Sequence, residues 1–172
     1  KRLVWRQHYP IDMSSRALRN EAGGVETNTL NAVQVELIGT CDPKHRTSWN
    51  GQGKLLAGKH YIYWPDAPEW ALAGLAHFLR WCNTEHGIPL TGAKTWLPYP
   101  KSFGSTAGNR FTFAQWRAFT GWCGHQHVPE NSHGDPGDID FARLLELAKP
   151  AAPGPAPATT TRVSRSRILL EA

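Results

Sequence analysis

The stretch GHQHVPENSHGDPG, residues 124–137, constrains the fold and chemistry of this chain more than any other segment. It places three histidines and one aspartate between two segments of helical pattern, with proline and glycine throughout. Imidazole nitrogens and a carboxylate oxygen are good zinc ligands, and a rigid loop can hold them without regular structure nearby. A polar turn with solvent-facing histidines would have a similar composition. Because the histidines cluster just before Asp135, we favour a metal site.

The longest helix is predicted over residues 65–85, upstream of this stretch. Asp66 is placed to cap its N-terminus, and Glu69 follows at the spacing of a capping box. We expect Gly87 to end the helix. Apolar residues at helical spacing predict one buried stripe, made of Leu72, Leu75, Leu79 and Cys82.

Two shorter helices are predicted on either side of the histidine-rich stretch. The first opens at Thr112, with Gln115 completing a capping pattern, and closes at Gly121. The second covers residues 138–149 and has Asp138 as its cap. Its inward-facing stripe is expected to contain Ile139, Ala142 and Leu145.

Two strands are predicted in the N-terminal part of the chain. Residues 2–12 mix β-branched and aromatic side chains and stop near a proline. Residues 32–38, AVQVELI, alternate strictly, which puts Val33, Val35 and Leu37 on one side and Glu36 on the other. Helices alternate with strands, which places the chain in the α/β class, although two or three strands are few for a full sheet.

Composition excludes several classes of protein. The 172 residues are 40% apolar, and they contain no apolar run long enough to span a membrane. The net charge of +5 favours an anionic partner such as nucleic acid, anionic lipid or a cell-wall polymer. Because lysine and arginine are dispersed rather than arranged in a stripe, nucleic acid ranks low. Three cysteines without a CxxC clip predict free thiols: Cys41, Cys82 and Cys123.

The composition changes abruptly at Pro150. Residues 150–172 begin PAAPGPAPATTT and continue with several arginines, which predicts an extended Pro/Ala-rich linker and a basic tail. Residues 1–149 are therefore predicted to form the folded domain.

The histidine-rich stretch resembles the C-terminal signature of type 2 N-acetylmuramoyl-L-alanine amidases, which are zinc enzymes. That signature is Gly-His, seven residues, lysine or histidine, one residue, and then aspartate or cysteine before Pro-Gly. His125, His133 and Asp135 fit this spacing without a gap. Residues 32–39, AVQVELIG, resemble the family's strand that carries a glutamate, and Glu36 falls on it. Residues 7–12, QHYPID, are a weaker match.

The resemblance implies a fold and a set of roles. The family shares its fold with peptidoglycan recognition proteins and several phage lysozymes, so a mixed central sheet flanked by helices is implied. His125 and Asp135 are implied to bind Zn²⁺, with Glu36 handling the proton of the attacking water. His133 is implied to stabilise the oxyanion. His127 matches no position of the signature. A group behind the metal ligands, a substrate contact and a surface residue are all open for it, and we favour the surface.

The family's first zinc ligand lies on an early strand, and in this alignment that strand falls before Lys1. The resemblance therefore implies a domain without its first strand and without one metal ligand. We expect weak activity from the chain as given.

The implied reaction is hydrolysis of the amide bond between N-acetylmuramic acid and L-alanine in peptidoglycan. The nearest likeness is to amidase domains of phage endolysins. With no signal peptide in this chain, we expect action on the bacterial wall after release from a host cytoplasm or after secretion, as a monomer. A non-catalytic peptidoglycan-binding module of the same fold is the alternative. Retention of Asp135 favours the enzyme.

Overall fold

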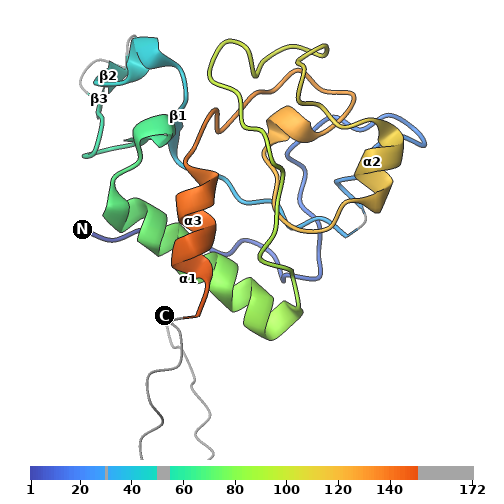
Figure 1. The fold of residues 1–172 in the computed structure, drawn as a ribbon, viewed down its shortest axis with the longest axis horizontal. Helices are drawn as coiled ribbons and strands as arrows, with labels where there is room; N and C mark the ends of the chain where they lie inside the picture. The colour runs from blue at the N-terminus through green and yellow to red at the C-terminus, as the bar shows by residue number, and fades with distance from the viewer. Residues whose placement is uncertain (30, 50–54, 151–172) are drawn as a thin grey trace, which may run out of the picture.

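The computed structural model describes residues 1–29, 31–49 and 55–150 (Figure 1). The predicted linker and tail after Pro150 lie outside the described residues. The described helices are α1 (Glu69–His86), α2 (Phe113–Ala118) and α3 (Phe141–Ala148), with short 3₁₀ turns at Pro43–His45, Trp64–Asp66 and His125–His127. The described strands are β1 (Gly39–Thr40), β2 (Ser48–Trp49), β3 (Leu55–Leu56) and β4 (Ile62–Tyr63).

The strands form two small ladders. β1 pairs with β4 in parallel, with Gly39 opposite Ile62. β2 pairs with β3 in the antiparallel sense, with Trp49 opposite Leu55, and lies at the end of the molecule away from α2 (Figure 1). The described chain is thus a mixed α/β structure, which confirms the predicted class. Its strands form two-stranded ladders in place of the single central sheet that we expected.

The two strands predicted in the N-terminal part are wrong, because the structure assigns no strand within residues 2–12 or 32–38. Side-chain patterns stabilise a strand only when a neighbouring strand is available for pairing. Trp5 instead stacks on Phe78 of α1, with ring centroids 4.7 Å apart. The side chain of Gln34 donates hydrogen bonds to the carbonyls of Ser15, at 2.5 Å, and Thr27, at 3.1 Å.

The expected inward face of residues 32–38 is also only partly correct. Leu37 packs against the core, whereas Val33 is 42% exposed. Glu36, which was predicted on the opposite side of the segment, is exposed. Pairing begins only at the end of this segment, where the amide of Ile62 donates to the carbonyl of Ile38 at 3.3 Å.

Helix α1 begins later than the sequence predicted. Asp66 belongs to the 3₁₀ turn Trp64–Asp66, and α1 starts at Glu69 with Pro68 as its N-cap and no side-chain cap. The predicted Asp66–Glu69 capping box is therefore wrong. The physical reason is that Ala67 precedes a proline and is held extended, with ψ 130°, so the helix cannot run through it. The predicted end is confirmed, since Gly87 is left-handed with φ 67°.

The main core lies between α1 and α3, and α3 lies across α1 in Figure 1. The predicted stripe of α1 is confirmed as buried, with Leu79 1% exposed. Helix α3 is capped by Asp140 rather than by Asp138, through a 2.9 Å hydrogen bond from the amide of Arg143. Of the predicted inner stripe, Ile139 is buried just before the helix and Leu145 packs against the core, whereas Ala142 is exposed. The buried residues of α3 itself are Phe141, Leu144 and Ala148. The predicted opening of α2 is confirmed, with both capping-box hydrogen bonds present between Thr112 and Gln115.

Among the described residues, no helix combines the length and the apolar character that crossing a membrane requires.

One arginine joins the two core helices through the C-terminal carbonyls of α3. Arg80 of α1 donates from Nη2 to the carbonyl of Leu147 at 2.6 Å and from Nε to the carbonyl of Ala148 at 3.1 Å. The last carbonyls of a helix have no partner within the helix, so another group must satisfy them. Arg80 does so while it holds α3 against α1.

We predict that Arg80→Met lowers the free energy of unfolding by about 2 kcal/mol, because carbonyls that accept from a charged donor lose their partner. Urea unfolding monitored by tryptophan fluorescence measures this. Arg117→Met is the matched control, since Arg117 is exposed on α2. Equal stability of the two variants would contradict the role given to Arg80.

Candidate metal centre

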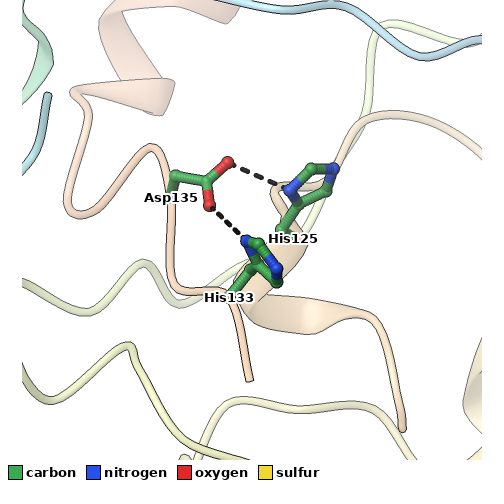
Figure 2. A group of neighbouring side chains, drawn as sticks. All are labelled: His125, His133 and Asp135. Carbon is green, nitrogen blue, oxygen red and sulfur yellow. Dashed lines mark ion pairs between the residues drawn. The ribbon is translucent and has the colours of Figure 1, made fainter. Parts of the chain in front are cut away.

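Three side chains from the histidine-rich stretch meet at one point (Figure 2). One ligand atom from each of His125, His133 and Asp135 lies within 4.8 Å of the other two. The Nδ1 atom of His125 lies 3.0 Å from Oδ2 of Asp135, and Nδ1 of His133 lies 3.7 Å from Oδ1. The structure therefore brings together the three residues that the sequence placed in the signature.

The spacing of these atoms fits a tetrahedral cation. Zinc lies about 2.0–2.1 Å from nitrogen and oxygen ligands, so the edges of its coordination tetrahedron are about 3.3 Å. The two nitrogen–oxygen distances, 3.0 and 3.7 Å, lie on either side of that value. Nδ1 of His125 is also buried and forms no hydrogen bond of acceptable geometry, although Asp135 is close. A cation between the two residues would satisfy that nitrogen.

The group is open to solvent on one side. The side chains of His125, His133 and Asp135 are 29%, 58% and 50% exposed. Catalytic zinc sites use three protein ligands and keep a further position for water or substrate. Three donors with partial exposure match that arrangement better than a closed structural site.

Asp135 is ionised in this arrangement. Burial raises the pKa of its carboxyl group, but the close pairing with His125, together with the charge of His133, outweighs burial and holds the pKa below its ordinary value. Burial and then the charge of Asp135 raise the pKa of the Cys41 thiol to about 11. Cys41 therefore carries no charge near neutral pH, and it does not belong to the group.

His127 belongs to the interior, so its expected place on the surface is wrong. Its ring is 1% exposed and packs edge-on against Trp96. The amide of Gly124 donates to Nδ1 at 3.0 Å, so the proton sits on Nε2, which donates to the carbonyl of Thr95 at 2.8 Å. Burial lowers the pKa of this histidine and keeps it neutral. Its two ring nitrogens thus join the loop at Gly124 to Thr95.

Gln126 is a second buried support that the sequence did not reveal. It is 0% exposed. Its Oε1 accepts from the amide of Leu97 at 2.8 Å and from Asn109, and its Nε2 donates to the carbonyl of Gly137 at 2.7 Å. A glutamine matches no ligand pattern, so only the tertiary contacts show its role. It links Leu97 and Asn109 to Gly137, at the end of the histidine-rich stretch.

Glu36, the predicted proton acceptor, does not belong to the group of three ligand residues. Its role in proton transfer stays a prediction.

Comparison of the chain with protein-family models, curated proteins and solved structures finds no match.

We predict that Gln126→Met lowers the free energy of unfolding by several kcal/mol, about 1–3 kcal/mol for each buried polar group left unpaired. Chemical denaturation measures the loss. Gln7→Met serves as the control, because Gln7 is exposed and its side chain donates to the nearby carbonyl of Tyr9. If both variants were equally stable, the buried hydrogen bonds of Gln126 would not support the loop.

We predict that His133→Lys weakens zinc binding more than tenfold, because an ammonium group must lose its proton before it can bind a metal. Competition with a chromophoric chelator measures the affinity. Lysine also occurs at this position of the signature that the sequence resembles. Unchanged affinity would therefore assign His133 to oxyanion stabilisation and not to the metal.

Proposed function

We propose that this chain is a zinc-dependent amidase that hydrolyses the bond between N-acetylmuramic acid and L-alanine in peptidoglycan. The observation that carries the proposal is the group of His125, His133 and Asp135, whose two nitrogen–oxygen distances match a zinc site and which is open to solvent on one side. The spacing of the same residues along the sequence supports peptidoglycan as the substrate, because that spacing fits the amidase signature.

The residues present fit the demands of amide hydrolysis. Bound zinc would supply a Lewis acid and would lower the pKa of a water molecule. His125 and the ionised Asp135 would hold the cation, and His133 would either complete the ligand set or donate to the oxyanion.

The reaction breaks one bond and forms one. A water oxygen bonds to the lactyl carbonyl carbon, and the carbon–nitrogen bond to L-alanine breaks. The products are a lactyl carboxylate and the free amine of alanine. Glu36 is proposed to take a proton from the attacking water and return it to the leaving amine.

The charge of the chain supports a wall polymer as partner. The net charge of +5 attracts anionic polymers, and an anionic cell-wall polymer is one partner that fits it. We propose that the protein acts at the bacterial wall.

A binding module without catalysis is the second candidate. One observation favours it, namely that Glu36 is not grouped with the three ligand residues. Under this alternative the chain would bind peptidoglycan and release no product.

We predict that Asp135→Asn abolishes release of stem peptides from purified peptidoglycan and weakens zinc binding, because the anionic ligand is lost. Asp138→Asn is the matched control, since Asp138 is an exposed aspartate nearby that is not in the group. The assay measures new alanine amino groups and new reducing sugars. An amidase produces the former and not the latter.

Wild-type chain that binds zinc and peptidoglycan but produces no amino groups would support the binding module. Wild-type chain that binds no zinc would contradict the metal centre itself.

A further inference from the structure

The guanidinium of Arg110 donates hydrogen bonds to the backbone of two of the three ligand residues of the metal centre. Nη1 donates to the carbonyl of His125 at 3.0 Å, and Nη2 donates to the carbonyl of His133 at 2.8 Å. Nη1 also donates to the carbonyl of Val128 at 3.0 Å, and Nε donates to the carbonyl of Gly104 at 2.8 Å. One planar group thus holds the ligand loop, residues 124–137, at His125 and at His133 and joins it to Gly104.

The partners of Arg110 are unusual for a partly buried arginine. Among the described residues no carboxylate forms an ion pair with it, and its acceptors are carbonyl oxygens together with the side-chain amide oxygen of Asn131. Burial lowers its pKa, yet an arginine stays protonated in proteins. Burying this cation costs desolvation free energy, and no ion pair among the described residues offsets that cost. What its hydrogen bonds provide is a fixed backbone geometry for the loop.

Asn131 makes a second link between the same two ligand residues. Its Oδ1 accepts from the amide of His133 at 2.8 Å, and its Nδ2 donates to the carbonyls of Val128 at 2.6 Å and His125 at 3.3 Å. His125 and His133 have no helix or strand between them after the turn that ends at His127. Their separation therefore depends on these side-chain hydrogen bonds.

We propose that Arg110 is a positioning residue for the metal centre, which sets the distance between His125 and His133 by fixing their backbone carbonyls. The inference rests on the proposed function only through its metal site.

The direction in which zinc affinity changes when Arg110 is replaced distinguishes a positioning role from a purely electrostatic one. A positive charge close to a dication site repels the cation, so its removal would, by this Coulomb term alone, strengthen metal binding. Removing a group that fixes the ligands weakens binding. Groups that orient metal ligands from behind are worth about 10–100-fold in metal affinity.

The experiment measures the affinity of the full chain for Zn²⁺ alone, by competition with a chromophoric chelator. We expect Arg110→Met to weaken binding by about 10–100-fold. The visible absorption of bound Co²⁺, which reports coordination geometry, should also change. Arg80→Met is the matched control, because Arg80 likewise donates to backbone carbonyls but does so at the end of α3. It should lower stability and leave zinc affinity unchanged.

Unchanged or tighter zinc binding by Arg110→Met overturns the inference, and so does an equal loss in Arg80→Met. If Arg110→Met does not fold, Arg110→Lys decides, because it keeps the charge but cannot reach both carbonyls with a rigid fork. Wild-type affinity and an unchanged Co²⁺ spectrum in Arg110→Lys overturn the inference. Wild-type chain that binds no zinc refutes the metal centre and this inference with it.

Discussion

Side-chain hydrogen bonds to backbone groups hold the ligand loop, and the candidate centre depends on them. Residues 124–137 contain a single 3₁₀ turn, so ladder hydrogen bonds of a helix or sheet cannot fix most of their backbone. The loop backbone is held instead by side-chain hydrogen bonds from Arg110, Gln126 and His127, each of which makes several polar contacts. Buried polar groups strongly favour one arrangement when all are paired, because an unpaired group is costly.

The loop is divided between two environments within a few residues. His125 points its ring toward Asp135 on the open side, while the next two residues, Gln126 and His127, are fully buried. The 3₁₀ turn makes this possible, because successive side chains leave it in different directions. The same turn therefore places His125 at the solvent-open side and buries Gln126 and His127 in the interior.

The apolar core and the candidate centre occupy different parts of the described chain but are connected. α1 and α3 pack through leucine, alanine and phenylalanine side chains, and Trp96 joins this core to His127. Trp96 also stacks on Phe141 at the start of α3, with ring centroids 4.8 Å apart. The packed helices α1 and α3 thus contact the loop through Trp96. Such support suits a site whose ligands must keep fixed distances.

Local patterns in the sequence determined the elements whose causes are local. The stripe of α1, its end at Gly87 and the capping box at Thr112 follow from neighbouring residues and are present. The ligand residues were also found locally, because all three lie within one short loop. Strand pairing, the inward place of His127 and the roles of Gln126 and Arg110 were decided only by the tertiary structure. Each depends on a partner distant in sequence, and a residue's own neighbourhood carries no information about that partner.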